Sequence, residues 1–240
     1  MHTAIIGNGP VGQFLGQRFG VEPLGRGVLP ARQTEVVFLA VPDDAIAHLA
    51  SELRDQGEWA LVHCSGAKSL ADLGAGGAAV WHPMRAFPRS SEIAADLHGA
   101  VVGLRGDPEL VSWLEAETRA WAGEPVRIDE EHAVMIHAAC CFAAGLSVSV
   151  ALHAQRLMES AGMTSDQART AVTRLGSGAV EQGLQGKGLT GPAVRGDLET
   201  IRAHLAELGP LAELYRHLTL SLAAHQALDP EVERHLSPVD

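Results

Sequence analysis

The chain has 240 residues, a formal net charge of −11, 46% hydrophobic residues and 20% charged residues. This composition is typical of a folded globular protein, and the length allows one large domain or two modest ones with separate cores. The acidic total argues against a general nucleic-acid binder, because binding a phosphate backbone requires a basic face. We therefore expect a small-molecule substrate and no nucleic-acid partner.

Cysteine usage and the N-terminal sequence indicate where the protein works. Three cysteines, Cys64, Cys140 and Cys141, are too few and too oddly spaced for a disulfide framework, which favours a reducing cytoplasm. The N-terminus has no basic region followed by an apolar one, so we expect no signal peptide. We accordingly predict a cytoplasmic protein.

A long stretch without Asp, Glu, Lys or Arg lies between Glu131 and Arg156 and is long enough for a membrane-spanning helix. Three histidines and two serines interrupt it, and it lacks aromatic belts and flanking clusters of lysine or arginine. A helix buried within a domain or at a subunit interface fits these features better. We therefore expect no membrane partner.

The first half of the chain alternates strand and helix signals. Short apolar, often β-branched runs predict strands at 3–6, 36–41, 60–63, 79–81 and 100–104, and a helix is predicted at 108–121. Asp43 or Asp44 is predicted to cap the helix that follows the second of these strands. A segment at 22–26 is too short and weakly patterned to assign. The alternation predicts a mainly parallel, doubly wound sheet.

After residue 128 the strand signals almost disappear. Helices are predicted at about 130–161, 164–183, 197–208 and 211–227, with Thr164 and Gln167 forming a capping box. The fold class is therefore an α/β Rossmann domain followed by an all-α helical domain. We place the dinucleotide-binding domain at 1–129 and a helical substrate and dimerisation domain at 130–240.

A glycine motif, GNGPVG, follows the first predicted strand and opens an amphipathic helix. In this setting Gly7 permits a tight turn, Gly9 permits close approach of a pyrophosphate, and Gly12 permits close packing of helix on strand. Free N–H groups at the helix start favour the phosphates. The predicted cofactor-binding residues are Gly7, Asn8, Gly9, Pro10, Val11 and Gly12.

Arg26 bears on the choice of cofactor. NAD-binding domains usually place an acidic residue after the second strand, whereas Gly25 and Arg26 occupy the corresponding region here. A guanidinium suits the 2′-phosphate of NADP, because it binds a phosphate at two points. We predict NADP, with NAD possible; the alternative is that Arg26 is only an exposed loop residue.

Several motifs occur in an order that resembles a known family. The glycine motif is followed by VPDD at 41–44, HCSGA at 63–67 and HPMRAF at 82–87, and then by LTGPAVRGDLETIRAHL at 189–205. The pattern is similar to bacterial Rossmann-like NAD(P)-dependent oxidoreductases that carry a C-terminal helical domain of unknown function and are related to ketopantoate reductase and pyrroline-5-carboxylate reductase. The resemblance implies a two-domain, dimeric oxidoreductase, and it adds Val41, Pro42 and Asp43 to the predicted cofactor site.

The sequence departs from that family pattern on the long helices. Ala144 and Gly145 stand where family members often carry Ser-Asn, and residues 179–184 contain no asparagine. In related reductases such polar groups face the cleft. This departure favours an alternative, a catalytically inactive dinucleotide-binding redox sensor or assembly protein.

Hydride transfer to a carbonyl or imine needs a proton donor near the developing negative charge. Ser65 and His82 follow predicted strands and can reach the carboxyl edge of the sheet, where such groups belong. His137, on a helix beside small residues, is our first choice for the acid, since a histidine titrates near neutral pH. Each also has a purely structural alternative. Ser65 can bond its own backbone in a turn, His82 can stabilise a tight turn before Pro83, and His137 can be a buried histidine bonded to a carbonyl.

Arg195 is the fourth predicted catalytic residue, because its guanidinium can hold a carboxylate of an acidic substrate at two points. It can instead pair with Asp197, which we expect to cap the next helix, or with a partner subunit. His137 and Cys141 share a helix face, but no cluster of three or four metal ligands is evident, so no metal is predicted. The apolar stretch at 132–155 predicts a homodimer joined through the helical half.

Overall fold

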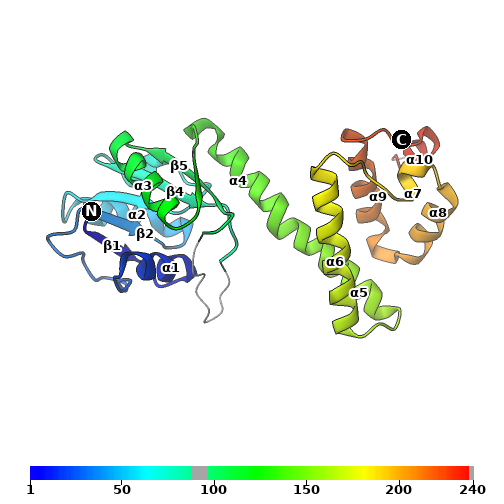
Figure 1. The fold of residues 1–240 in the computed structure, drawn as a ribbon, viewed down its shortest axis with the longest axis horizontal. Helices are drawn as coiled ribbons and strands as arrows, with labels where there is room; N and C mark the ends of the chain where they lie inside the picture. Colours follow the sequence, from blue (N-terminus) through cyan, green and yellow to red (C-terminus); the bar gives the residue numbers. More distant parts are fainter. Residues whose placement is uncertain (88–96, 238–240) are drawn as a thin grey trace. The chain divides into compact units, whose positions relative to one another are not determined.

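The chain, described by a computed structural model over residues 1–87 and 97–237, forms two compact units, Met1–Val148 and Ser149–Asp240 (Figure 1). The first unit holds a six-stranded sheet: β1 (Thr3–Ile6), β2 (Val36–Leu39), β3 (Ala60–His63), β4 (Ala78–Pro83), β5 (Val101–Gly106) and β6 (Glu124–Arg127). Its α-helices are α1 (Pro10–Phe19), α2 (Ile46–Arg54), α3 (Pro108–Ala120) and α4 (Ala133–Cys141), with a π-helical segment at Phe142–Leu146.

The strands follow one another across the sheet in the order β1-β2-β3-β4-β5-β6. The pairs β1–β2, β2–β3, β3–β4 and β5–β6 are parallel, whereas β4 and β5 are antiparallel. Each strand predicted from the sequence is present within one to two residues of its expected bounds. The prediction of a mainly parallel sheet followed by helices is confirmed.

Alternate residues of the strands pack into two hydrophobic cores, one on each face of the sheet. Phe38 of β2 packs with Phe14 of α1 and Leu114 of α3 on one face. Leu39, the next residue, packs with Ile46 and Leu53 of α2 on the other face. Because both faces are covered, the strands are continuously apolar rather than alternating, as a doubly wound sheet requires.

Two short elements at the edges of the sheet explain why the sequence pattern was weak there. Next to β1, the segment at 22–26 makes a single parallel bridge, Ile6 with Leu24, in place of a full strand. At the other edge β6 has the sequence EPVR and no buried position, so neither alternation nor an apolar run marks it. A proline at a sheet edge is consistent with this location, since the edge requires fewer backbone donors.

The second unit is helical over the residues that the structure describes. Its helices are α5 (Ser147–Ser160, which begins at the boundary), α6 (Ser165–Leu184), α7 (Pro192–Arg195), α8 (Leu198–Glu207), α9 (Ala212–Ser221) and α10 (Pro230–Leu236). The predicted capping box is present, because Thr164 accepts from the N–H of Gln167 and the Gln167 side chain returns to Thr164. A small core around Ile201 and Val232 joins α8 to α10.

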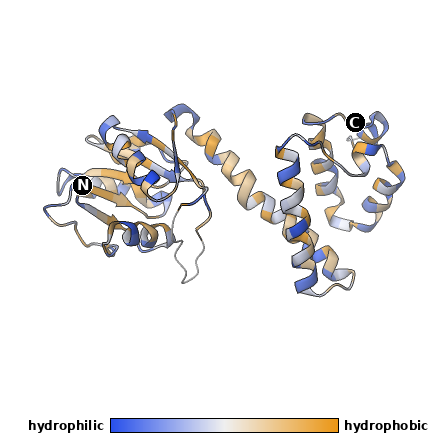
Figure 2. Cartoon of the chain, viewed as in Figure 1, coloured by the Kyte–Doolittle hydropathy of each residue, from blue (hydrophilic) through white to orange (hydrophobic). Residues whose placement is uncertain are grey.

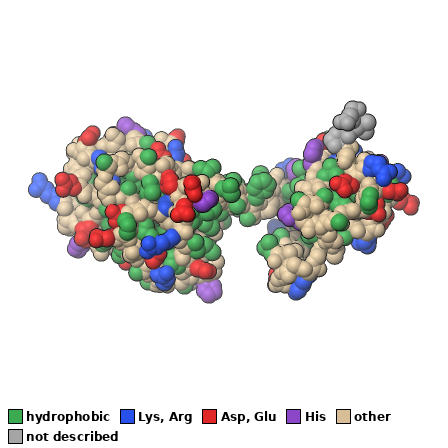
Figure 3. Space-filling model, turned by 90° about the horizontal axis from the view of Figure 1, so that it is seen from above, with side chains coloured by type: hydrophobic (Ala, Val, Ile, Leu, Met, Phe, Trp, Pro, Cys, Tyr) green, Lys and Arg blue, Asp and Glu red, His purple; other side chains and the backbone are tan. Residues whose placement is uncertain are grey.

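One helical stretch is apolar and exposed. Glu130–Ser160 spans 31 residues, and its most apolar 18-residue window has a mean hydropathy of 1.9 and is only 6% buried within the chain. Figures 2 and 3 show hydrophobic residues gathered along this stretch. By length and composition alone it could cross a membrane, but a single such helix is weak evidence because helices that pack against protein have the same composition.

Candidate active site

The glycine motif forms a tight turn between β1 and α1. Gly7 has a φ of 114°, and a Cβ placed there would lie 2.2 Å from the carbonyl oxygen of Ala40. A Cβ on Gly12 would lie 1.8 Å from the carbonyl oxygen of Gly7. Both positions therefore require glycine for the fold itself. A Cβ on Gly9 would meet no atom of residues 1–87 or 97–237 within 4 Å, so the missing side chain leaves open space that the described part of the fold does not need.

The open space lies at the N-terminus of α1. Gly9 is the N-cap, no side chain caps the helix, and Pro10 occupies the first turn. The side chain of Asn8 is held by the Nε2 of Gln13, which donates to its Oδ1 at 3.2 Å. The N–H groups of Val11 and Gly12 belong to this first turn, where the helix dipole is positive. An anionic group such as a pyrophosphate fits this end of the helix.

Arg26 lies on an exposed turn close to the glycine motif. The N–H of Leu24 donates to the carbonyl of Ile5 at 2.7 Å, and the N–H of Gly7 donates to the carbonyl of Leu24 at 3.2 Å. These bonds hold the chain two residues before Arg26 against the glycine turn. The guanidinium is solvent-exposed. Its position beside the turn suits the predicted contact with a 2′-phosphate.

The VPDD segment continues the same edge of the sheet beyond β2. The side chain of Val41 would lie 3.3 Å from a Cβ at Gly7, which places it against the glycine turn. The prediction that Asp43 or Asp44 caps the next helix is wrong, since Pro42 precedes the short 3-10 helix Asp43–Ala45 and no side chain caps it or α2. The carboxylate of Asp43 instead accepts a hydrogen bond from the Ser65 hydroxyl at 2.9 Å.

Ser65 holds the loop that follows β3 in place through several hydrogen bonds. Its Oγ donates to Asp43 and accepts from the N–H groups of Ala67 and Lys68, both at 3.2 Å. The Ser65 N–H donates to Nδ1 of the fully buried His63, whose Nε2 lies 3.3 Å from the carbonyl of Ser69 and donates to it. Burial chiefly lowers the pKa of His63, which keeps the ring neutral. The Ser65 hydroxyl proton is thus already engaged by Asp43.

Two histidines meet over Gly66 in the same loop. The ring centroids of His82, near the end of β4, and His137, on α4, are 5.7 Å apart at an angle of 61°. A Cβ on Gly66 would lie 2.6 Å from ring atoms of both, so only glycine fits between them. The fold therefore brings together Ser65, His82 and His137, which the sequence predicted as site residues from three separate segments.

The two rings have different electrostatic surroundings. Burial is the largest cause that lowers the pKa of His82 to about 4; nearby His137, Arg105 and His63 lower it further, and Asp43 opposes them. The Nδ1 of His137 is buried without a hydrogen-bond partner among the described residues, whereas its Nε2 lies 3.7 Å from the Sγ of Cys141. Only the Nε2 side of His137 can therefore present a proton to a ligand.

Both histidines line one cavity of about 580 Å³ within the first unit. Its wall is otherwise mostly apolar and comes from the end of β4 and from α4 with the π-helical segment: Pro83, Met84, Arg85, Ala86, Cys140, Cys141, Ala143, Ala144, Gly145 and Leu146. This volume suits a small organic molecule. Ala144 and Gly145, which replace polar residues of the resembled pattern, form part of the wall.

Two of the cysteines have thiols whose pKa is raised by burial. Burial raises the pKa of Cys64 to about 12, so its thiol stays protonated near neutral pH. Burial, with a contribution from Cys141, also raises the pKa of Cys140. Within residues 1–87 and 97–237, no group of three or more His, Cys, Asp and Glu side chains is arranged to hold a metal ion.

Arg195 belongs to the second unit, where it ends α7 and is exposed. The expected N-cap is present, because Asp197 accepts from the N–H of Thr200 at 3.1 Å and from its hydroxyl at 2.8 Å. His204, farther along α8, lies 2.9 Å from the Tyr215 hydroxyl. That Arg195 joins Ser65, His82 and His137 around one substrate stays a prediction, as does the boundary of the two domains at residue 129.

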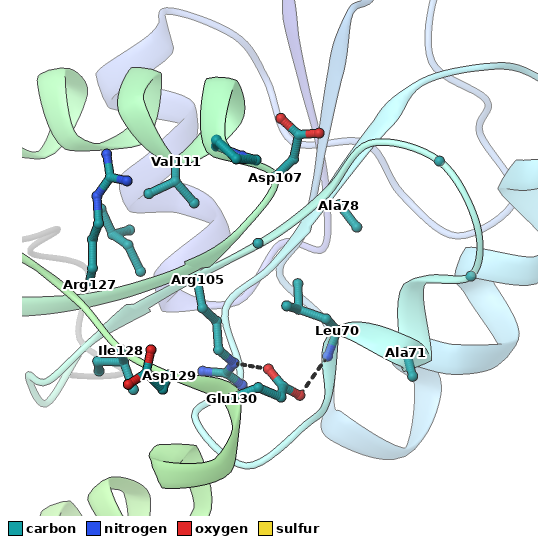
Figure 4. A pocket seen from close by; sticks show the side chains of 15 residues that line it. Leu70, Ala71, Ala78, Arg105, Asp107, Val111, Arg127, Ile128, Asp129 and Glu130 are labelled. Atoms are coloured by element: carbon teal, nitrogen blue, oxygen red, sulfur yellow. Dashed lines mark hydrogen bonds and ion pairs between the residues drawn. The ribbon is translucent and has the colours of Figure 1, made fainter.

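Sequence reasoning missed one group beside the histidines, a buried arginine on β5. Arg105 is only 5% exposed and donates from Nε to the Glu130 carboxylate at 2.6 Å (Figure 4). The signal was faint: an arginine within an apolar strand, VVGLRG, whose buried charge a carboxylate partner would have to balance.

Residues 100–222 match the family model of a domain of unknown function, DUF2520. The match spans just over half of the chain. The protein belongs to this family. The matched region begins before β5, so it includes the last two strands of the sheet and α4 as well as most of the helical unit. No curated protein matches the chain.

Solved structures with this fold include several reductases. A protein from Thermotoga maritima, TM1727, has a TM-score of 0.71 at 23% identity and covers 97% of this chain and 98% of its own. An imine reductase from Myxococcus stipitatus in complex with NADP+ has a TM-score of 0.67 at 16% identity, with coverages of 98% and 99%. The pyrroline carboxylate reductase of Plasmodium falciparum with NADP bound has a TM-score of 0.62 at 10% identity, with coverages of 99% and 98%. At these identities the likeness shows a shared fold, and the family resemblance inferred from the motifs is confirmed at that level.

Proposed function

We propose that this protein is an NADP-dependent oxidoreductase that transfers a hydride between the cofactor and a small carbonyl or imine compound. The observation that carries the proposal is the open space at Gly9, on an uncapped helix N-terminus, at the same sheet edge as a cavity lined by two histidines. Two of the structural neighbours are solved with NADP, which supports the choice of cofactor.

The residues present fit a dinucleotide. The backbone of residues 7–12 would hold the pyrophosphate, with Val41, Pro42 and Asp43 beside it, and Arg26 would bind the 2′-phosphate. When bound, the reduced cofactor supplies the hydride. The protein must then bind and orient the acceptor, exclude water from it and provide a proton.

His137 is the proposed proton donor. Its Nδ1 is buried, which leaves Nε2, 3.7 Å from the Sγ of Cys141 in the same cavity wall, as the atom that would present the proton. The cavity is otherwise mostly apolar, so a developing negative charge on oxygen or nitrogen would attract a proton strongly. His82 stays neutral because its pKa is depressed to about 4, so the pair does not carry two positive charges. Ser65 orients the loop beneath them through its bond to Asp43. Arg195 is proposed to hold a carboxylate if the substrate is acidic.

The second candidate is a dinucleotide-binding protein without hydride chemistry, acting as a redox sensor or assembly partner. Ala144 and Gly145 favour it, because they leave that part of the cavity wall without a hydrogen-bonding side chain. The paired histidines favour the enzyme, since a protein that only binds a dinucleotide does not need two imidazoles in the cavity.

Calorimetric titration with NADPH and NADH, followed by a screen of small 2-oxo acids and cyclic imines for cofactor oxidation, separates the candidates. The enzyme binds NADPH and oxidises it with some acceptor; the sensor binds it and oxidises none. Binding of neither cofactor would reject both proposals. With an acceptor identified, His137→Ala should lower kcat while sparing cofactor affinity, and His132→Ala, an exposed histidine at the start of the same helical stretch, should change neither.

A further inference from the structure

The buried Arg105 joins three separate segments around the site. Its Nε donates to Oε2 of Glu130 at 2.6 Å and its NH2 group donates to the carbonyl of Lys68 at 2.5 Å. The other carboxylate oxygen of Glu130, Oε1, accepts from the N–H of Leu70 at 3.0 Å. Figure 4 shows Arg105 and Leu70 converging on the two oxygens of Glu130. The pair thus ties β5 to the loop after β3 and to the residues that precede α4.

Glu130 and Arg105 lie on segments that adjoin the two histidines. Glu130 begins the helical stretch that carries His137 seven residues later, about two turns along. Lys68 and Leu70 follow Gly66 in the loop on which both rings pack. Arg105 pairs across β4 and β5 with Val80, two residues before His82. Each segment that the ion pair joins therefore either carries one of the residues that meet at Gly66 or, in the case of β5, pairs with the strand that carries His82.

The packing around Gly66 makes the placement of the rings sensitive to small shifts. A methyl group on Gly66 would lie only 2.6 Å from ring atoms of both His82 and His137, so the two rings are packed tightly against the backbone of Gly66. A loop or a helix start that moved by an ångström would open this contact, and the buried Nδ1 of His137 would then meet water.

We propose that the Arg105–Glu130 ion pair is a positioning clamp that fixes the start of α4 against the loop after β3 and so holds His137 over Gly66 beside His82. The catalytic meaning of the clamp rests on the proposed function; the positioning itself does not. Burial acts to raise the pKa of Glu130, but hydrogen bonds from Ser69 and Leu70 and the charge of Arg105 outweigh it and leave the pKa lowered, so the clamp is ionised near neutral pH.

Two substitutions at Glu130 separate positioning from simple charge. Glu130→Gln removes the charge and keeps a side chain of the same length with one acceptor oxygen, so it can retain one of the two hydrogen bonds that Glu130 accepts and should hold the helix start in part. Glu130→Ala removes both bonds and should release it. Glu131→Ala is the matched control, because it deletes the exposed neighbouring carboxylate, which lies 3.8 Å from the Nε2 of His132 and takes no part in the Arg105 ion pair.

Nuclear magnetic resonance of the protein labelled on its histidine rings gives the readout without a substrate. The wild type and Glu131→Ala should show a nuclear Overhauser contact between the rings of His82 and His137, and Glu130→Ala should lose it. The pKa of His82 is set by burial and by His137, Arg105, His63 and Asp43. The pKa of His82 should rise in Glu130→Ala, because the ring gains water, and should rise less in Glu130→Gln, which keeps one of the two hydrogen bonds.

The direction in which the pKa of His82 changes distinguishes positioning by the ion pair from a purely electrostatic effect. If the pair acted only through charge, loss of Glu130 would leave Arg105 less screened, and the pKa of His82 would stay low or fall further in both variants. A retained ring contact in a folded Glu130→Ala would also overturn the clamp. If Glu130→Ala does not fold, Glu130→Asp serves, since its shorter side chain cannot span both partners; a retained contact there would equally overturn the proposal.

The same variants keep the clamp distinct from the proposed function. NADPH affinity should change less than twofold in all of them, because none touches the glycine turn. Once an acceptor is known, Glu130→Ala should lower kcat by tenfold or more, and Glu130→Gln, which retains one of the two hydrogen bonds, should lower it less. If the wild type binds no NADPH, the proposed function fails while the ring contact still reports whether the clamp exists.

Discussion

The hydroxyl of Ser65 donates a hydrogen bond to Oδ2 of Asp43 at 2.9 Å and so joins the segments that follow β3 and β2. One of these segments borders the glycine turn through Val41, and the other carries Gly66 beneath the histidine pair. The bond therefore connects the proposed cofactor side of the site to its proposed catalytic side. Loss of this hydrogen bond should affect both the proposed cofactor side and the proposed catalytic side.

Ser65→Ala removes the bond to Asp43 and the two bonds that Ser65 Oγ accepts from Ala67 and Lys68, so it should lower the free energy of unfolding by more than the ~0.5–1.5 kcal/mol that is usual for one hydrogen bond in a protein. Asp43→Asn should cost less, because the amide can still accept from the hydroxyl. Asp44→Asn, on the adjacent exposed carboxylate, should cost nothing measurable. Urea denaturation of the four proteins checks this, and equal stability of Ser65→Ala and the wild type would show that the bond does not hold the two segments.

Gly9 offers a substitution that tests the cofactor site without disturbing the fold. Because a Cβ there meets no atom of the part of the chain that the structure describes within 4 Å and the backbone is extended at φ −77° and ψ 178°, Gly9→Ala should fold normally. Gly9→Asp should weaken NADPH binding about tenfold or more, a loss of ~1.4 kcal/mol, because it fills the space and opposes the phosphate charge. Calorimetry gives the affinities.

The matched comparison for Gly9 is Gly7, where alanine would collide with Ala40 and require a positive φ. Gly7→Ala should lower the melting temperature, whereas Gly9→Ala should not. Gly176→Ala, in α6 with open space around it, should leave NADPH binding unchanged. Unaltered NADPH affinity in Gly9→Asp would move the dinucleotide away from this turn.

Arg26 should set the preference for NADPH over NADH. Loss of a charged hydrogen-bond partner costs about 1.5–3 kcal/mol, so Arg26→Ala should reduce the ratio of the two affinities about tenfold or more. Binding of NADH should hardly change, since it lacks the 2′-phosphate. Arg32→Ala, an exposed arginine farther along the same connection, is the control. An unchanged ratio in Arg26→Ala would make it an ordinary loop residue.

The sequence predicted best those parts of the fold whose pattern is local. The run at 36–41 and the glycine motif are read from neighbouring residues, and both appear where expected. The strand EPVR and the one-residue bridge at Leu24 were not predicted, because they form by pairing with the edge of an existing sheet and have no sequence pattern of their own. The role of Asp43 was misassigned because its partner, Ser65, lies 22 residues away.

The histidine pair shows the same limit at the site. His82 and His137 were each selected for their chemistry, but nothing in a single sequence places them 5.7 Å apart across Gly66. Arg105 was overlooked because its importance depends on burial and on two partners 25 and 37 residues away. Long-range pairings of this kind follow from the topology of the sheet, which brings the ends of β3 and β4 together.

The depressed pKa of His82 predicts a loss of stability in acid. Its folded-state pKa of about 4 lies below the ordinary value of 6.5, so the unfolded chain binds more protons between these values. The contribution is complete above pH 6.5 and is lost as the pH falls to about 4. With 1.36 kcal/mol for each pKa unit and a ring that is only partly enclosed, we expect about 1–3 kcal/mol.

His82→Gln should flatten this part of the stability curve measured by urea denaturation between pH 7 and 4. His48→Gln should leave it unchanged, because the His48 side chain is 81% exposed. Parallel curves for His82→Gln and the wild type would mean that the ring titrates normally in the folded protein.

The exposed apolar helix should be covered by a second copy of the chain. Within the chain Met135 is 73% exposed, Phe142 71%, Val148 54% and Leu152 50%, all in the stretch Glu130–Ser160. A continuous apolar strip of this length rarely faces water in a stable protein, and a symmetric pair is the commonest way to bury it. Small residues at Ala143, Ala144 and Gly145 would let two helices approach closely.

Light scattering at micromolar concentration should therefore give twice the mass of the chain. Val148 and Leu152 lie one turn apart on the same helix face, so Val148→Glu with Leu152→Glu would bury two charges at a symmetric contact and should shift the protein to monomers. Val28→Glu, on an apolar residue 50% exposed in the first unit, should leave the mass unchanged. A wild-type protein that is monomeric at high micromolar concentration contradicts the dimer. A preparation that stays dispersed only in detergent would instead indicate that lipid covers this helix, because its length and hydropathy satisfy a bilayer as well as a partner subunit.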